Sequence, residues 1–252
     1  MGETLRNGFR HIGAVTLLLR DSVRALFSRP FEGHALMEQF YRIGVKSLSI
    51  ATITGVFSGM VLALEAAYTL AIYGARMLTG KAVALSVVQE LGPVLTGLVI
   101  AGRVGAGITA EIGSMAVTEQ VDAIRALGAD PVKKLVMPRL VALVVMLPAL
   151  TILADFLGIL GGMVISIFET GQTASYYLNQ VVSALGFREV FTGTGKTPFF
   201  ALIISLVACY NGMRASGGAD GVGRATTQTV VVASVLILIS NFFLTKFFYI
   251  IL

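Results

Sequence analysis

The ionisable side chains inside or at the ends of the long apolar stretches of this chain include Glu65, Glu90, Asp155 and Lys196. On insertion scales an ionisable group at the bilayer centre costs about 2.5–3.5 kcal/mol, so such a group usually faces a partner side chain or a polar cavity. Three acids and one base at these positions suit headgroup binding, proton relay or interhelical ion pairing. Which of these applies depends on the elements that hold the four residues.

Glu90 is the most informative of the four because Leu91, Gly92 and Pro93 follow it directly. Proline removes a backbone donor and glycine loosens the helical hydrogen bonding, so we expect a kink in the apolar segment that contains them. A carboxylate beside a kink either lines a cavity or belongs to a structural pair that holds the kink.

Three strings resemble nucleotide-binding motifs, but their surroundings do not suit a nucleotide. The string 105–110 fits G-x-G-x-x-A, yet it follows an apolar span instead of a strand. The string 195–197 (Gly-Lys-Thr) resembles the end of a phosphate-binding loop, but the earlier glycine of that loop would fall at Val190. The glycine-rich segment 212–224 contains no lysine. We therefore expect no catalytic residue and no cofactor in this chain.

Residue types that bind metals are sparse. The single cysteine, Cys209, lies in an apolar run, and both His11 and His34 fall in the N-terminal 40 residues. These positions exclude an intrachain disulfide and predict no metal site.

The composition is that of a polytopic membrane protein. The 252 residues are 56% hydrophobic and 13% charged, whereas a soluble domain has about 25% charged residues. Mean hydropathy is +0.84. Since one crossing takes about 20 residues, we expect an all-α fold with five transmembrane helices at about 45–73, 82–101, 136–168, 198–211 and 229–251. We expect Pro148 to break the third span and residues 169–194 to form one short outer helix.

Small residues in two of these spans predict close helix packing. Gly55 and Gly59 form a G-x-x-x-G pattern in the first span, and the third span contains Gly158, Gly161 and Gly162. Such faces allow helix backbones to approach closely in lipid.

Residues 1–40 are predicted to form an N-terminal amphipathic arm, followed by a membrane domain over 41–252. Apolar residues recur in the arm at helical spacing and arginines fill the other side, as in a helix that lies in the membrane interface. A soluble helix packed on a partner is the alternative. Pro30 is expected to separate the arm from the membrane domain.

Basic residues predict the orientation. Seven Lys and Arg fall in the first 46 residues, five in 102–139 and two in 212–224. The opposite segments hold Arg76, Lys81, Arg188 and Lys196. The positive-inside rule therefore places the N-terminus and both loops in the cytoplasm and the C-terminus on the other side.

The loop 102–139 holds nine charged residues. We expect Thr118 to cap a short helix whose first turn carries Glu119 and Asp122, which is favourable at the positive helix end. Gly128 is expected to end this helix.

The same short helix has an apolar side. Val121, Ile124 and Leu127 share one face, and after them Asp130 and Pro131 are expected to begin a second helix. An amphipathic helix with an acidic start suits a groove on a partner protein. The alternative is a loop that packs only against its own bundle.

This loop also carries a resemblance. Residues 110–139, AEIGSMAVTEQVDAIRALGADPVKKLVMPR, closely resemble the signature of the MlaE-type permeases of ABC lipid transporters. Further matches are QELGPV at 89–94, AGR at 101–103, FTGTGK at 191–196 and GVGRATTQTVV at 221–231. The resemblance extends from about Tyr41 to the C-terminus. One departure is Asn241, where the resemblance leads us to expect an acid.

The resemblance implies a non-catalytic permease subunit that acts as a homodimer, with ATP bound and hydrolysed by separate cytoplasmic ABC ATPase subunits. It also implies a periplasmic ring of MCE-domain proteins and, in some systems, a STAS-domain protein on the ATPase. The implied cargo is phospholipid, moved between the inner and outer membranes of a Gram-negative cell to maintain lipid asymmetry. The chain would be a multi-pass inner-membrane protein without a nucleic-acid partner.

The resemblance implies one set of residues that binds lipid and another that binds the ATPase. The lipid cavity is expected to be lined by Glu90, Leu91, Tyr73, Lys196 and Glu65. The ATPase is expected to be held by Glu111, Thr118, Glu119, Val121, Asp122, Ile124, Arg125 and Leu127. Simpler roles remain open for some of them: Lys196 snorkelling to the interface, Glu65 pairing between helices and Tyr73 anchoring a helix end.

Two other functions fit parts of the pattern. An ion-coupled secondary transporter of a lipophilic substrate would use Glu65, Glu90 and Asp155 as relays, but such transporters usually contain inverted repeats, and no convincing repeat is present. An intramembrane enzyme acting on lipid would need a nucleophile–base pair or metal ligands at membrane depth, and neither histidine lies there.

Overall fold

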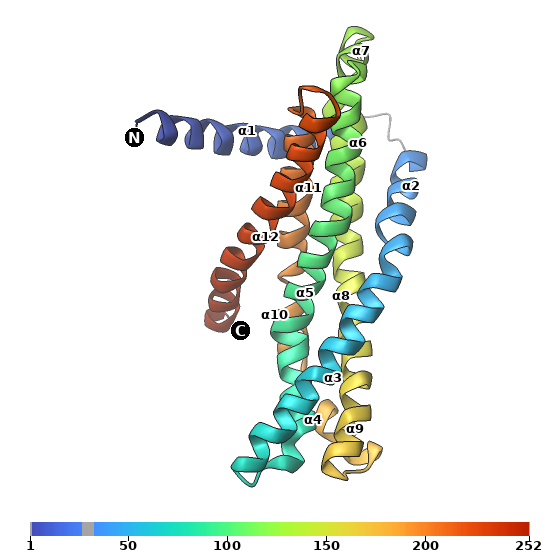
Figure 1. Cartoon of the computed structure of the whole chain (residues 1–252), viewed down its shortest axis with the longest axis vertical. Helices are drawn as coiled ribbons and strands as arrows, with labels where there is room; N and C mark the ends of the chain where they lie inside the picture. Colours follow the sequence, from blue (N-terminus) through green and yellow to red (C-terminus); the bar gives the residue numbers. More distant parts are fainter. Residues whose placement is uncertain (1, 27–32, 252) are drawn as a thin grey trace. The chain divides into compact units, whose positions relative to one another are not determined.

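The structure is a computed structural model that describes residues 2–26 and 33–251, and the side chains of 13–26 and 33–251. All regular elements within these ranges are helices, so the predicted all-α fold is confirmed. The α-helices are α1 (Gly2–Leu26), α2 (Gly33–Ile43), α3 (Leu48–Ile72), α4 (Thr79–Ser86), α5 (Gly92–Ile100), α6 (Ala106–Val117), α7 (Gln120–Ala126), α8 (Met137–Thr170), α9 (Ala174–Ala184), α10 (Phe187–Thr194), α11 (Thr197–Met213) and α12 (Gly218–Ile251) (Figure 1). Three π-helical turns join some of them, η3 (Val87–Leu91), η4 (Ala101–Gly105) and η5 (Val132–Val136). Pro30, expected to end the N-terminal arm, lies outside the described residues.

Five helical segments of the described chain are long and apolar enough to cross a membrane, which confirms the predicted number. They are Gly33–Ile72, Arg76–Val117, Val132–Thr170, Phe187–Met213 and Gly218–Ile251. Each is longer than the roughly 20 residues that a crossing needs, so these helices extend beyond the predicted spans at one end or both.

The connection between the second and third segments is shorter than the predicted loop 102–139. Helix α6 continues the second segment to Val117, and η5 begins the third at Val132. Residues 106–117 are mostly apolar or small, and Ile112 is completely buried. They therefore favour a helix packed inside protein over a solvated loop, and the polar connection is reduced to residues 118–131.

Three other predictions were wrong in detail. Helix α8 is continuous through Pro148, because surrounding protein and lipid favour helical hydrogen bonding even where proline removes one bond. Residues 169–194 form two helices, α9 and α10, because Gly186 adopts an extended conformation between them and Glu189 accepts a hydrogen bond from its N–H. Most of the glycine-rich loop 212–224 is helical, since α12 begins at Gly218.

Contacts along the chain divide it into two compact units. The first consists of the N-terminal residues up to Ile43, of Ile100–Val144 and of Ala201–Leu236. The second consists of Gly44–Val99, of Val145–Phe200 and of the part of α12 from Ile237 onwards.

In the second unit, α3 packs tightly against α8 through the small residues that the sequence predicted for this purpose. A Cβ added at Gly59 would overlap the carbonyl of Gly158, and one added at Gly55 would lie 2.5 Å from the carbonyl oxygen of Ala154. Helix α9 packs beside α4 (Figure 1). There the buried Tyr177 donates a hydrogen bond to the carbonyl of Ile159 in α8.

In the first unit, buried hydroxyl groups join α6, α11 and α12. Thr109 donates to the carbonyl of Ala208 and lies 2.9 Å from the hydroxyl of Thr229, to which Asn211 also donates. Helix α1 packs against η5. Within the described residues 2–26 and 33–40 the N-terminal arm is helical, as predicted, and α1 contacts the segment that begins the third span.

Candidate functional site

The centre of the candidate site is the π-helical turn η3, which lies directly before Pro93 in the second unit. Pro93 has no backbone N–H, so the carbonyl of Gln89 does not receive the hydrogen bond that residue 93 would give in an α-helix. The ammonium group of Lys196 donates to this carbonyl at 2.9 Å. The sequence predicted a disturbance of the helix at this point, and the structure shows how a distant side chain compensates for it.

A neighbouring carbonyl of η3 is covered by glycine. A π-helical turn would direct the N–H of residue 93 to the carbonyl of Val88 instead of Gln89, and since proline has no N–H, neither carbonyl has a donor at this position. Gly193 of α10 lies so close to the Val88 carbonyl that an added Cβ would overlap it. The strings 89–94 and 191–196 are thus two halves of one contact, in which Gly193 allows the approach and Lys196 supplies the donor.

Lys196 is completely buried and uses its full set of donors. Besides the Gln89 carbonyl, its ammonium contacts Oε1 of Glu90 at 2.8 Å and the hydroxyl of Thr245 at 2.7 Å. An ammonium has three N–H donors, and three acceptors surround it. Snorkelling of Lys196 to the interface is therefore wrong for this structure, since its charged end points into the protein.

Glu90 is the other half of this ion pair. Its Oε1 also accepts from Thr245 at 3.0 Å, and its Oε2 accepts from the side-chain amide of Asn241 at 3.0 Å. The Glu90 side chain is nevertheless 39% exposed, in contrast to Lys196. The carboxylate therefore has partners on one side and an accessible surface on the other.

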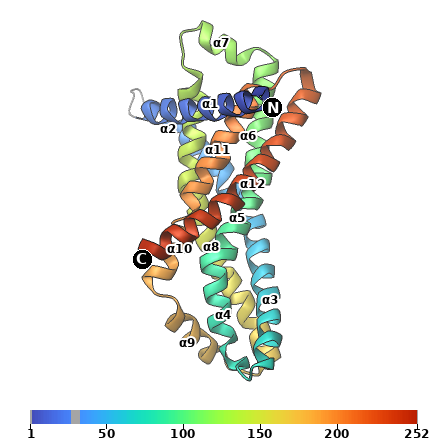
Figure 2. The ribbon, with the colours of Figure 1, turned by 90° about the vertical axis from the view of Figure 1, so that its left-hand side faces the viewer.

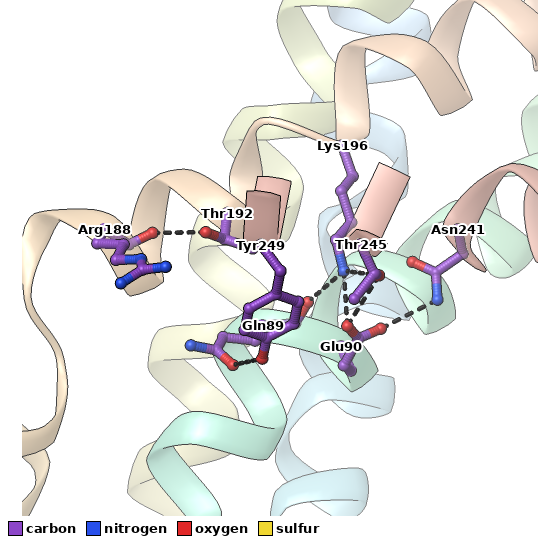
Figure 3. Close-up of polar contacts among 8 residues, drawn as sticks. All are labelled: Gln89, Glu90, Arg188, Thr192, Lys196, Asn241, Thr245 and Tyr249. Carbon is purple, nitrogen blue, oxygen red and sulfur yellow. Dashed lines mark hydrogen bonds and ion pairs between the residues drawn. The ribbon is translucent and has the colours of Figure 1, made fainter. Parts of the chain in front are cut away.

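Helix α12 contributes one face to the network (Figure 3). Asn241, Thr245 and Tyr249 follow one another at intervals of four residues, which places them on the same side of a helix. Tyr249 contacts the side-chain oxygen of Gln89 at 3.1 Å. Figure 3 shows Gln89 and Glu90 facing these α12 side chains, with Lys196 between the two helices.

An apolar groove of about 370 Å³ adjoins this network. It brings together Glu65 and Leu91, two of the residues expected at a lipid cavity, and its walls are Phe57, Ser58, Val61, Leu62 and Leu95. Leu91 follows Glu90 directly, so the groove and the ion pair share η3. Tyr73 does not line the groove; it is the residue after α3 and is 78% exposed.

Asp155 occupies a different place from the other acids. It lies buried in α8, and its Oδ1 fills the space that a side chain at position 92 would need. Among the described residues this oxygen has no hydrogen-bond partner. Gly92 is therefore required for the fit of α8 against η3.

The predicted ATPase-binding residues lie in the first unit, around α7. Contrary to expectation, Thr118 does not cap α7; it ends α6, and its hydroxyl donates back to the carbonyl of Ser114 at 2.8 Å. Glu119 precedes α7 in a left-handed conformation with φ +60°. Two helices thus meet at a sharp turn between Thr118 and Gln120, which the cap pattern alone did not reveal.

The C-terminal end of α7 matches the sequence expectation. Gly128 has φ +75°, its N–H bonds to the Arg125 carbonyl, and the next N–H bonds to the Ile124 carbonyl. This is the Schellman arrangement that glycine permits. Asp130 then accepts from the N–H of Val132 and begins the following helix with Pro131.

The surface of α7 is mixed. Val121 is buried, Ile124 is half-buried, and Leu127 is 85% exposed. Asp122 and Arg125 form an exposed ion pair at 2.8 Å. The apolar stripe therefore starts inside the unit and ends in solvent.

Glu111 anchors this region to the rest of the first unit. Its two oxygens pair with Arg42 of α2 at 3.2 Å and with the buried Arg139 of α8 at 3.0 Å. Three helices that are far apart in sequence thus meet at one carboxylate.

The family model for the permease MlaE matches residues 36–247. The chain belongs to the MlaE permease family. It is 34% identical over 249 residues to the intermembrane phospholipid transport system permease protein MlaE of Haemophilus influenzae, covering 97% of this chain and 94% of that protein. It is 40% identical over 235 residues to a probable ABC transporter permease protein of Rickettsia typhi, covering 93% and 91%. A probable ABC transporter permease protein of Synechocystis is 44% identical over 209 residues, covering 83% and 80%.

Sequence reasoning missed part of the network in this MlaE-family permease. The sequence indicated Asn241 only as a departure from an expected acid, and it led to no prediction for Thr245 or Tyr249. Their four-residue spacing near the end of an apolar helix was the available signal. It did not identify Glu90 as the partner of Asn241 and Thr245, or Gln89 as that of Tyr249, since 151 residues separate Asn241 from Glu90.

Proposed function

We propose that this chain is the transmembrane permease subunit of an ABC transporter that moves phospholipid between the inner and outer membranes. The single observation that carries the proposal is the position of the Glu90–Lys196 pair. The pair joins two membrane-spanning segments, the Glu90 side chain is 39% exposed, and Glu90 shares η3 with an apolar groove. A phospholipid needs an apolar surface for its acyl chains and polar groups for its headgroup, and this arrangement supplies both.

In this proposal, acyl chains lie against Phe57, Val61 and Leu91 in the groove. Glu90 meets the headgroup from its exposed side, and Lys196 sets the position and charge of Glu90. Glu65 stands on the wall of the same groove and offers a second polar contact. The relative named for phospholipid transport in Haemophilus supports this cargo.

The ATPase contact is assigned to α7 and its flanks. Helix α7 protrudes between the second and third spans, and its exposed Leu127, Asp122 and Arg125 form a surface of mixed chemistry. A short amphipathic helix of this kind suits a groove on a partner. The Glu111 ion pairs with Arg42 and Arg139 would pass a displacement of this region on to α2 and α8.

The remaining partners follow from the same function. Two copies of the chain would enclose the lipid path, two ABC ATPase subunits would bind ATP, and periplasmic MCE-domain proteins would receive or deliver lipid, with a STAS-domain protein on the ATPase in some systems. The N-terminus and the 118–131 connection lie in the cytoplasm and the C-terminus in the periplasm, as the positive-inside rule predicts.

Reconstitution tests the proposal. In vesicles that contain the permease with its ATPase, transfer of labelled phospholipid should require ATP hydrolysis and should continue after the proton gradient is collapsed. Transfer that stops with the gradient, or runs at full rate without nucleotide, would overturn the proposal.

The ATPase contact has its own test. The double change Glu119→Lys and Asp122→Lys should abolish co-purification of the ATPase while the permease still inserts. Asp21→Lys with Asp220→Lys makes the same change of charge elsewhere in the first unit and should retain the ATPase. If the first pair of changes leaves the complex intact, α7 is not the contact.

A further inference from the structure

The first unit contains a second cavity, which none of the roles above uses. Its volume is about 630 Å³, and it is bordered by α1, by α11 and by the N-terminal part of α12. Figure 2 shows α1 crossing near the beginning of α12. This volume lies within the range of about 300–1,000 Å³ typical of small-molecule sites.

One end of the cavity is cationic. Arg214 and Arg224 both line it, and no carboxylate is among its lining residues in the described chain. Arg214 donates to the Tyr210 hydroxyl and lies 5.2 Å from the centre of that ring, which holds its guanidinium in place. Asp220, the nearest acid along α12, borders an adjoining groove that Arg224 and Gln228 also line. Because α12 begins at Gly218, its positive helix end adds to the potential here.

The other end of the cavity is apolar. Val207, Val232 and Leu236 line it together with Val15 of α1. Twelve residues of α12 separate Arg224 from Leu236, which corresponds to about 18 Å along a helix. The polar end is thus at the start of the fifth membrane-spanning segment, and the apolar end lies within that segment.

We propose that this cavity binds an anionic phospholipid of the surrounding membrane, with its phosphate at Arg214 and Arg224 and an acyl chain along Val232 and Leu236. Guanidinium groups form paired, charge-assisted hydrogen bonds with phosphate oxygens. The length from the cationic to the apolar end suits an amphiphile, whereas a free anion would leave the apolar end unfilled. The site is separate from the Glu90 network, and the inference holds whatever lipid that network transports.

Fluorescence quenching tests this assignment directly. The chain contains no tryptophan, so Leu236→Trp in the full-length protein places a single fluorophore at the apolar end. The protein is reconstituted in phosphatidylcholine vesicles that contain a fixed fraction of either brominated phosphatidylglycerol or brominated phosphatidylcholine. We expect the brominated anionic lipid to quench more strongly, with about a fivefold preference for each arginine near the headgroup.

Three variants make the result specific. In the Leu236→Trp background, Arg214→Gln with Arg224→Gln should abolish the preference, whereas Lys81→Gln with Arg188→Gln removes two exposed cations elsewhere and should retain it. A tryptophan at Phe243, which is 63% exposed on α12, replaces the one at Leu236 and should show equal quenching by the two lipids.

Several outcomes would overturn the assignment. Equal quenching at position 236 by both lipids would exclude selective binding, and a preference that survives the arginine changes would exclude their role. A preference lost on addition of inorganic phosphate would assign the arginines to a free anion. Loss of the ATPase or of the second copy in the arginine variant, with unchanged quenching, would assign them to a protein contact.

Discussion

The ammonium group of Lys196 lies 2.9 Å from the main-chain carbonyl oxygen of Gln89 and donates a hydrogen bond to it. Pro93 deprives this carbonyl of its helical donor, so a side chain 107 residues later in the chain completes the hydrogen bonding of the second span. The same ammonium pairs with Glu90. Lys196 is therefore part of the structure of the distorted helix as well as part of the polar site.

Lys196→Met should destabilise the protein more than Glu90→Gln. Methionine keeps the length of the side chain but leaves the Gln89 carbonyl without its donor and Glu90 without its cation, and a buried group left unpaired costs about 1–3 kcal/mol. Glutamine at position 90 retains an acceptor for Lys196 and Thr245. Thermal unfolding in detergent measures the difference, and equal midpoints for Lys196→Met and the parent would contradict this account.

Gly193→Ala should weaken the contact between α10 and η3. The new Cβ would overlap the Val88 carbonyl, so the helices must separate, at a cost of about 1–3 kcal/mol. Gly223→Ala is the matched control, because that position is also helical and nothing lies within 4 Å of an added Cβ. The control should be neutral or slightly more stable, since alanine is the better helix former. Similar unfolding midpoints for both variants would show that Gly193 is not a close contact.

Gly59→Ala should likewise separate α3 from α8. Its Cβ would overlap the Gly158 carbonyl, and loss of this small-residue face removes close packing that lipid cannot replace. Gly107→Ala, which meets no atom within 4 Å, serves as the control. Protease sensitivity in membranes should rise for the first variant alone, and a rise in both would point to a general effect of alanine.

Thr245→Val should cost more than Tyr249→Phe. The Thr245 hydroxyl accepts from Lys196 and donates to Glu90, so valine breaks two bonds inside the network at about 1 kcal/mol each. Tyr249 is exposed and contacts only the rim at Gln89. Chemical unfolding of both variants should therefore show a clear loss for Thr245→Val and little change for Tyr249→Phe, and the reverse order would refute the network's geometry.

Features that depend on local sequence were predictable. The number of membrane-spanning segments follows from apolar runs, and the Gly55–Gly59 face follows from residue size. The end of α7 at Gly128 and the start of the next helix at Asp130 follow from backbone preferences that neighbours hardly alter.

Features that depend on tertiary partners were not predictable. The Thr118 side chain has the right chemistry for a helix N-cap. However, the next residue, Glu119, has a left-handed backbone conformation, so Thr118 ends α6 instead of starting α7. Residues 106–117 contain one charge and two glycines, which suggested a loop. In the fold, burial of Ile112 and pairing of Glu111 with Arg139 favour a helix instead. The sequence placed Lys196 at the end of a span. Only the fold shows that its ammonium group pairs with Glu90 instead of reaching the lipid interface.

The late arrival of Lys196 has a consequence for biogenesis. While the chain is being synthesised, the second span enters the bilayer with a main-chain oxygen that no nearby residue can serve, and it stays so until α10 and the lysine have been translated. The second span therefore lacks the hydrogen bond to its Gln89 carbonyl when it is first inserted. We therefore expect a nascent chain that stops before α10 to be held at the insertion machinery or degraded.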